Sequence, residues 1–210
     1  MLYNSSNITW SSFGEHWRLA RKICLVELFS AKRLESFEHI RIEEVARMVD
    51  SVFETCQLGL PVKIREETYA MSNNIISRMV LGRRYLDKEV GNKMRSKEFK
   101  EMLEELFVLN GVFNIGDFIP WLAWLDLQGY VRRMKTLSKR LDAFLEEVVE
   151  EHDRRRKGVE NYVAKDMVDV LLQQADDPLL NLNRIRVKAY TLACTLQLFP
   201  SHCHALLLYC

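Results

Sequence analysis

Apolar residues recur at steps of three and four along most of the chain, which is the spacing of one face of an α-helix. Four segments show this spacing clearly: residues 45–56, 75–80, 99–107 and 141–152. Gly82 predicts the end of the second helix, and the basic run 153–158 predicts the end of the fourth. Glycine suits the position after a helix, and cations suit its last turn. The pattern therefore predicts a mainly α chain.

The helical spacing breaks at residues 59–61, 116–129, 158–165 and 176–178. The second break is unusual for a connection because it carries large apolar side chains: Phe118, Trp121, Trp124 and Leu125. Two interpretations stay open, in which these side chains either fold back on the core or contact a membrane surface. No window approaches the roughly 18 consecutive apolar residues of a spanning helix, and no signal peptide is recognisable.

Composition changes this picture little. The chain has 210 residues, of which 48% are hydrophobic and 28% charged, with a net charge of +1, as in ordinary globular proteins. A near-neutral charge argues against a nucleic-acid partner, since such binding relies on clustered Lys and Arg. Five cysteines without an export signal fit a reducing compartment with free thiols.

Trp17 and Arg21 form the most informative pair in the sequence. Residues four apart lie on the same face of a helix, so this face presents an indole N–H beside a guanidinium. Both groups only donate hydrogen bonds, and the guanidinium matches a carboxylate at two points. The pair predicts a grip on an anionic group. The alternative is that Arg21 simply stacks on the neighbouring indole.

Three segments carry a resemblance to a known family. Residues 13–24 read FGEHWRLARKIC and, with 27–37, resemble the C-helix of plant cytochrome P-450 monooxygenases. Residues 113–122 read FNIGDFIPWL and resemble the F–G loop region of the group that includes flavonoid and terpenoid hydroxylases. Residues 165–172 read KDMVDVLL and resemble that group's H-helix. The resemblance implies a mainly α, partial cytochrome P-450 fold from the C-helix to the start of the I-helix, without most of the β-rich subdomain.

The resemblance also implies roles for particular residues. In the family, the C-helix Trp and Arg donate hydrogen bonds to a haem propionate, and by position that role falls on Trp17 and Arg21. Residues just before the F–G loop line the substrate pocket, which implies pocket-wall roles for Leu109, Asn110 and Val112. Ordinary helix packing is the alternative for those three residues.

Partners and location follow from the resemblance in the same way. The intact family takes electrons from NADPH-cytochrome reductase, activates O2 at haem iron and hydroxylates a small apolar or phenolic metabolite. Its members lie on the cytosolic face of the endoplasmic reticulum membrane. The segment from Phe118 to Trp124 corresponds to a region near the substrate entrance that can dip into the bilayer interface. The start of this chain does not resemble the family's apolar anchor, so we expect the chain itself in the cytosol.

The iron ligand of the family has no counterpart in the sequence. The family holds iron through one cysteine in a loop of the pattern Phe-x-x-Gly-x-Arg-x-Cys-x-Gly, and this thiolate favours O–O cleavage. None of the five cysteines has those neighbours: Cys24, Cys56, Cys194, Cys203 and Cys210. We therefore expect no catalytic residue here. Two functions stay open, a fragment of a haem-dependent monooxygenase or a catalytically inert, truncated helical protein that binds no haem.

The resemblance stops after Thr191, which predicts a partial domain over residues 1–191 and an aberrant tail over 192–210. Pro200 would stop a helix, because it lacks an N–H and clashes with the preceding turn. We hypothesise that the tail comes from a retained intron or a shifted reading frame. The run 202–204, His-Cys-His, invites a zinc site, but its spacing does not match paired cysteine ligands. No metal site is therefore predicted.

Overall fold

The computed structural model describes residues 3, 11–85, 93–177, 180 and 182–198. The regular structure of this described part is helical and contains no strand, which confirms the mainly α class. In chain order the elements are α1 (Glu15–Ile23), η2 (Cys24–Leu28), α2 (Ala31–Ser36), α3 (Glu38–Gln57), α4 (Ile64–Leu81), α5 (Lys93–Gly111), α6 (Ile115–Phe118), η3 (Pro120–Leu125), α7 (Tyr130–Arg156), α8 (Met167–Ala175) and α9 (Arg184–Leu198). Element η2 is π-helical and continues α1 directly, whereas η3 is a 3-10 helix.

The predicted helical stripes lie in α3, α4, α5 and α7, and both predicted helix ends are confirmed. Helix α4 ends at Leu81, and Gly82 follows in the left-handed region with a φ of 71°. Glycine adopts this conformation without the steric cost that a Cβ brings. Helix α7 ends at Arg156 after a basic last turn, and Gly158 lies just beyond with a φ of 81°.

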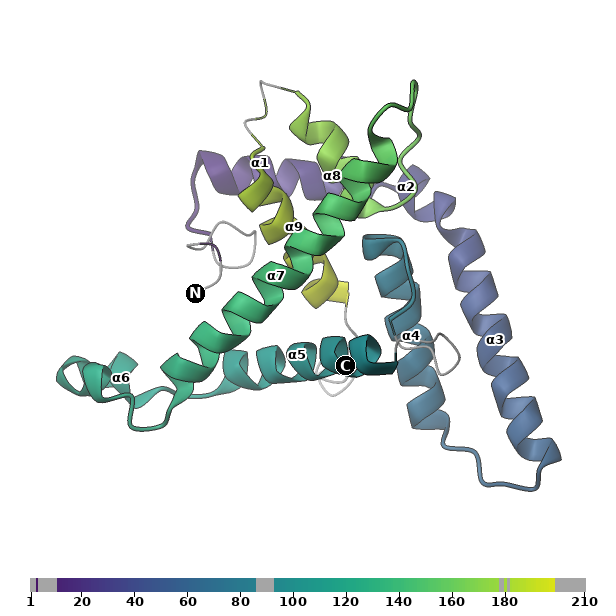
Figure 1. The fold of residues 1–210 in the computed structure, drawn as a ribbon, viewed down its shortest axis with the longest axis horizontal. Helices are drawn as coiled ribbons and strands as arrows, with labels where there is room; N and C mark the ends of the chain where they lie inside the picture. The colour runs from purple at the N-terminus through teal and green to yellow at the C-terminus, as the bar shows by residue number, and fades with distance from the viewer. Residues whose placement is uncertain (1–2, 4–10, 86–92, 178–179, 181, 199–210) are drawn as a thin grey trace.

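The helices are arranged around α9. Figure 1 shows α7 crossing the molecule diagonally and α3 and α4 forming an antiparallel hairpin on one side. Helix α9 packs against α4, α7 and α8, while α5 packs against α7. The segment of α6 and η3 extends beyond the far ends of α5 and α7 (Figure 1). The core therefore lies between these packed helices, and the segment of α6 and η3 extends away from it.

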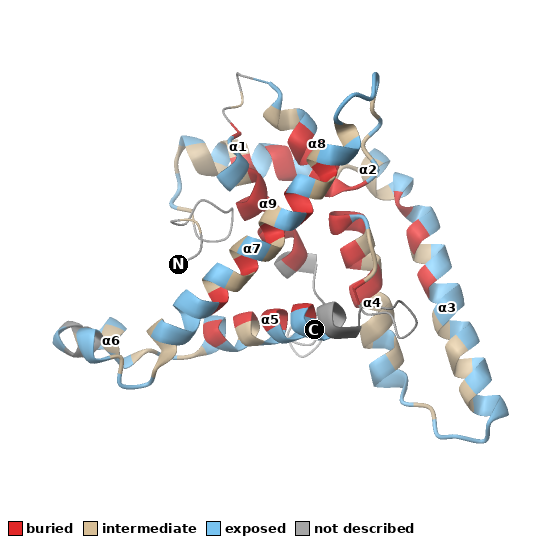
Figure 2. Cartoon of the chain, in the orientation of Figure 1, coloured by how far each residue is buried: buried red, intermediate tan, exposed pale blue. Residues whose placement is uncertain are grey.

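Helix α9 is buried over most of its described length. Every residue from 187 to 195 is buried, including Tyr190 at 0% exposure. Figure 2 shows buried positions concentrated where α4, α7, α8 and α9 meet. Since full burial of a large apolar side chain stabilises a fold by roughly 1.5–3 kcal/mol, we infer that this region supplies much of the packing energy of the described chain.

One charged side chain lies within this buried stretch. Lys188 is 6% exposed, and its Nζ lies 2.5 Å from an Asp142 oxygen and 2.9 Å from a Glu146 oxygen, both on α7. The hydrogen bond from Lys188 holds the pKa of each carboxylate below its ordinary value, although desolvation opposes the shift. Because a buried ammonium needs such partners, the pair fixes how α9 lies on α7.

Helix α3 is held by charge more than by its apolar stripe. Its buried Glu44 accepts hydrogen bonds at 2.6 Å from Arg78 and from Arg84. By contrast, Val49 and Phe53 of the predicted stripe are 55% and 62% exposed. The stripe predicted the helix correctly, but four of its six apolar residues are exposed and none is buried.

The apolar break between α5 and α7 also lies at the surface. Phe118, Trp121 and Trp124 are 71%, 77% and 80% exposed. The interpretation in which these side chains fold back on the core is therefore wrong. Within the described residues, no helix combines the length and the apolar content that crossing a bilayer requires.

Candidate functional site

Helix α1 presents Trp17 and Arg21 side by side. The guanidinium carbon of Arg21 lies 5.3 Å from the centroid of the Trp17 ring, which places the cation over the aromatic face. Phe13 extends the aromatic surface, with its ring centroid 5.4 Å from that of Trp17. Trp17 is half-buried and Arg21 is exposed. Trp17 and Arg21 therefore share one helix face, as predicted. Arg21 also stacks on the Trp17 indole, as the alternative interpretation expected.

The stacked pair keeps hydrogen-bond donors available. Within the described part of the chain, neither the Trp17 indole nor the Arg21 guanidinium has a hydrogen-bond acceptor, and Arg21 has no carboxylate partner. Contact with an aromatic face uses none of the five N–H donors of a guanidinium. The site can therefore receive an acidic group by charge-assisted hydrogen bonds, which fits the propionate of a haem.

The neighbouring face of α1 fixes the orientation of this pair. Ala20 and Ile23 are buried in the core. His16 lies between the Ser11 hydroxyl, 3.1 Å from Nδ1, and the Tyr190 hydroxyl of α9, 3.4 Å from Nε2. Burial, with a further contribution from a nearby arginine, lowers the pKa of His16. The docking of α1 on α9 leaves the face with Trp17 and Arg21 turned outward.

The predicted pocket-wall residues lie at the end of α5, just before α6. Leu109 is buried in the core at 3% exposure, and Val112 packs against that core. Asn110 between them is exposed. This placement fits ordinary helix packing for Leu109 and Val112, and the pocket-wall role of all three stays a prediction.

The structure assembles a buried polar cluster that the sequence patterns do not predict. His152 at the end of α7 donates from Nδ1 to the Val148 carbonyl at 2.7 Å, and its Nε2 lies 2.9 Å from an Asp166 oxygen. An Arg155 nitrogen also lies 2.7 Å from Nε2. The exposed fractions of His152 and Asp166 are 0% and 1%.

The same cluster organises the start of α8. Asp166 is the N-cap, and its other oxygen accepts from the Asp169 amide at 2.9 Å. Asp169 in turn accepts from the Tyr162 hydroxyl at 2.9 Å and the Lys165 amide at 3.0 Å. Burial and then the bond to Asp169 raise the pKa of Tyr162 to about 12. Loop 158–165 is thereby tied to α8.

This donor set has two possible uses. His152, Asp166 and Asp169 offer ligand atoms that lie within 4.8 Å of one another, and one imidazole with two carboxylates can bind zinc or iron. However, the guanidinium of Arg155 already lies at Nε2, and amide and hydroxyl donors hold one oxygen of each carboxylate. We interpret the cluster as a structural lock between α7 and α8. A capping aspartate in the 165–172 segment and a histidine ending an apolar stripe were its signals in the sequence.

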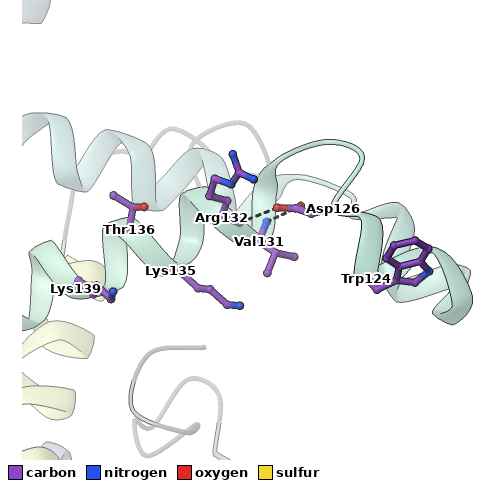
Figure 3. A pocket seen from close by; sticks show the side chains of 7 residues that line it. All are labelled: Trp124, Asp126, Val131, Arg132, Lys135, Thr136 and Lys139. Atoms are coloured by element: carbon purple, nitrogen blue, oxygen red, sulfur yellow. Dashed lines mark hydrogen bonds between the residues drawn. The ribbon is translucent and has the colours of Figure 1, made fainter.

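A shallow, cationic groove lies where η3 meets α7. Its volume is about 420 Å³, and its lining residues are Trp124, Asp126, Val131, Arg132, Lys135, Thr136 and Lys139. Figure 3 shows Asp126 accepting two backbone hydrogen bonds from the first turn of α7. These bonds lower the pKa of Asp126, and the bond from the Arg132 amide contributes most. Three cations therefore line a groove beside an exposed indole, which suits an anionic surface.

Comparisons with known proteins show the family of the chain. The sequence model of the cytochrome P450 family matches residues 2–194. A flavonoid 3'-monooxygenase of Crocosmia x crocosmiiflora is 39% identical over 193 residues, which are 90% of this chain and 37% of the relative. Cytochrome P450 71A1 of Persea americana is 36% identical over 197 residues, 91% of this chain and 38% of the relative. A flavonoid 3'-monooxygenase of Petunia hybrida is 37% identical over 193 residues, with 91% and 37% covered.

The chain belongs to the cytochrome P450 family, and its described part is a partial, mainly α version of that fold. It spans 37% to 38% of the length of these relatives. The family match ends at residue 194, within α9, and this helix continues without a break from Thr191 to Leu198. The division after residue 191 stays a prediction. Pro200 and the run 202–204 lie outside the described residues.

A side chain at Gly82 should destabilise the fold, because Gly82 lies against Asp166 of the structural lock between α7 and α8. A Cβ on Gly82 would lie 2.3 Å from an Asp166 oxygen, whereas a Cβ on Gly59, which has a similar φ of 65°, would meet nothing within 4 Å. Alanine at either position costs roughly 1–2 kcal/mol for left-handed backbone. Gly82→Ala should cost about 1–3 kcal/mol more, because it breaks a buried hydrogen bond.

Urea unfolding followed by circular dichroism measures this difference in the free energy of unfolding. Gly59→Ala is the matched control, since it shares the backbone strain and lacks the clash. Equal destabilisation by the two substitutions would show that the lock around Asp166 contributes nothing to stability.

Proposed function

We propose that this chain carries the haem-propionate grip of a plant haem-dependent monooxygenase that hydroxylates a small apolar or phenolic metabolite. The observation that carries the proposal is the pair Trp17 and Arg21, oriented by the docking of α1 and without an acceptor in the described part of the chain. Family membership supports it independently. The alternative is a non-catalytic helical product that binds no haem, and a measurement of haem binding distinguishes the two.

In this proposal Trp17 and Arg21 each donate to a haem propionate. The indole supplies one N–H, and the guanidinium supplies two parallel donors and a full positive charge. When bound, haem supplies the activation of O2 that hydroxylation requires. The residues of this chain bind and orient the haem. The family's cysteine loop, which supplies the thiolate ligand, has no counterpart in this sequence.

Substrate and electron donor are proposed from the relatives. Two of the relatives above are named flavonoid 3'-monooxygenases, so a phenolic ring is the substrate class that we propose. NADPH-cytochrome reductase is the proposed electron donor. Leu109, Asn110 and Val112 are the proposed contributors to the substrate pocket.

We further propose that the segment from Phe118 to Trp124 contacts a membrane surface, with the intact protein on the cytosolic face of the endoplasmic reticulum. The exposure of Phe118, Trp121 and Trp124 supports this, because aromatic side chains favour the boundary between headgroups and acyl chains. The adjacent groove, with cations on α7, adds attraction to anionic headgroups.

The haem grip is tested in a chimera that joins residues 1–191 to the remaining C-terminal part of the Petunia hybrida relative. The chimera should give the carbon monoxide difference band of thiolate-ligated haem. Arg21→Ala should increase the rate of haem loss to apomyoglobin about tenfold or more, since a charge-assisted hydrogen bond contributes roughly 1.5–3 kcal/mol.

Arg18→Ala is the matched control, because Arg18 is an exposed arginine of the same helix that stacks on Phe13 at 5.0 Å. Its haem loss should equal that of the parent chimera. Equal rates for Arg21→Ala and Arg18→Ala would remove the assigned role from Arg21. A chimera that folds, as judged by circular dichroism, and binds no haem would favour the inert alternative.

The membrane contact is tested by co-sedimentation of the chain with vesicles of phosphatidylcholine and phosphatidylserine. Replacing both Trp121 and Trp124 by serine should weaken partitioning at least about tenfold, because each inserted indole contributes on the order of 1.5–3 kcal/mol. Added salt should weaken it further if the groove cations contribute.

The control variant replaces Leu58 and Leu60 by serine, since these apolar residues between α3 and α4 are also 73% and 56% exposed. This variant should partition like the parent chain. The same loss of binding in both variants would mean that general hydrophobicity, rather than the segment from Phe118 to Trp124, drives the association.

A further inference from the structure

The structural lock between α7 and α8 holds three ligand atoms close together. His152, Asp166 and Asp169 are at most 1% exposed, and each offers one ligand atom within 4.8 Å of the others. The Asp169 amide binds Oδ1 of Asp166, while the Tyr162 hydroxyl and the Lys165 amide both bind Oδ2 of Asp169. These bonds orient the two carboxylates and leave the other oxygen of each to face a further partner.

The imidazole is oriented in the same way. Because the Val148 carbonyl can only accept, the 2.7 Å bond requires a proton on Nδ1 of His152. In the neutral imidazole, Nε2 then carries the lone pair, and a metal binds a histidine in this state. Metal-binding histidines commonly donate their other N–H to a backbone carbonyl or a carboxylate, which fixes the ring.

An orphaned atom of Asp169 points to a ligand. Its Oδ1 is buried and has no hydrogen-bond partner within the described part of the chain. The partners of Oδ2, a hydroxyl and an amide, are neutral. A buried carboxylate oxygen without a partner is costly, and buried charges are ordinarily paired or bound to a metal. A divalent cation would satisfy this oxygen and neutralise both carboxylates of the lock.

Two exposed residues lie over the cluster. Gly82 is exposed, and a Cβ built on it would clash with Oδ2 of Asp166 and lie 3.6 Å from Nε2 of His152. Arg155 is exposed as well, and one nitrogen of its guanidinium lies 2.7 Å from Nε2. The cluster is therefore only one residue deep, and rotation of the Arg155 side chain into solvent gives an ion access. The guanidinium holds the place beside Nε2 that a metal cation would take.

We propose that His152, Asp166 and Asp169 form a zinc site at the junction of α7 and α8. The ligands are Nε2 of His152, Oδ2 of Asp166 and Oδ1 of Asp169, and a fourth position is left for water. Zinc accepts one imidazole and two carboxylates at roughly 2.0–2.2 Å, so its binding draws the three atoms together and moves the Arg155 guanidinium outward. The imidazole disfavours Mg²⁺ and Ca²⁺, which prefer oxygen ligands. This inference does not depend on the haem role of Trp17 and Arg21.

The test measures zinc affinity at neutral pH by competition with a chromogenic chelator. It uses the full chain with five other residues that could bind zinc replaced: Cys56→Ser, His202→Ala, Cys203→Ser, His204→Ala and Cys210→Ser. This parent should bind one zinc ion per chain. Zinc should also raise its melting temperature, because a ligand that binds only the native state stabilises it.

Asp169→Asn removes the proposed oxygen ligand and preserves the lock, since the amide carbonyl can still accept from Tyr162 and Lys165. It should weaken zinc binding about 100-fold or more, because even the outer partners of metal ligands contribute about 10–100-fold in affinity. Asp176→Asn is the matched control, since Asp176 is an exposed aspartate that pairs with Arg156 at the ends of the same two helices. It should bind zinc like the parent.

Arg155→Gln gives a change in the opposite direction. It should bind zinc about tenfold more tightly, or more, because zinc no longer displaces a charge-assisted hydrogen bond. Circular dichroism of the metal-free variants checks that each is folded, and Arg155→Gln decides the question if Asp169→Asn is not. A parent that binds no zinc would overturn the proposal. Equal affinity of the parent and folded Asp169→Asn, which means an adventitious ion only, or unchanged or weaker binding by Arg155→Gln would also overturn it.

Discussion

The burial of helix α9 is the constraint on which the rest of this structure depends. From residue 187 to residue 195 this helix has no position open to water, so it requires partners on all sides. Helices α4, α7 and α8 supply them, and α1 adds the contact between His16 and Tyr190. The one charge in the stretch, Lys188, is accommodated only because α7 places Asp142 and Glu146 beside it.

This arrangement determines which surfaces are free to interact. Because one face of α1 docks on the core, Trp17 and Arg21 are presented outward with their donors available. Elements farther from α9 are less covered, and α3 exposes Val49 and Phe53. Such open apolar faces favour association, since burial of apolar surface is the main term that drives it.

Local patterns in the sequence were sufficient for α3, α4, α5 and α7 and for the pair Trp17 and Arg21, but not for α6 and η3, which lie in a predicted break. Both depend on residues only a few positions apart, where helical spacing determines geometry. The same patterns could not show that Glu44 would be buried against Arg78, or that Lys188 would meet Asp142. These contacts join residues distant in sequence, and only packing decides them. Nor could the pattern of the break between α5 and α7 distinguish core from surface, because exposed aromatic residues look the same as buried ones in sequence.

Amide hydrogen exchange measured by mass spectrometry on the intact chain is the most direct test of the central role of α9. Exchange rates report local opening free energies, which rise from near zero in frayed segments to the global value in the core. The account predicts that amides of residues 187–195 exchange slowest, together with the buried turns of α7 and α8. Amides of α3 and of residues 115–125 should exchange much faster. Exchange of 187–195 as fast as that of α3 would contradict the account.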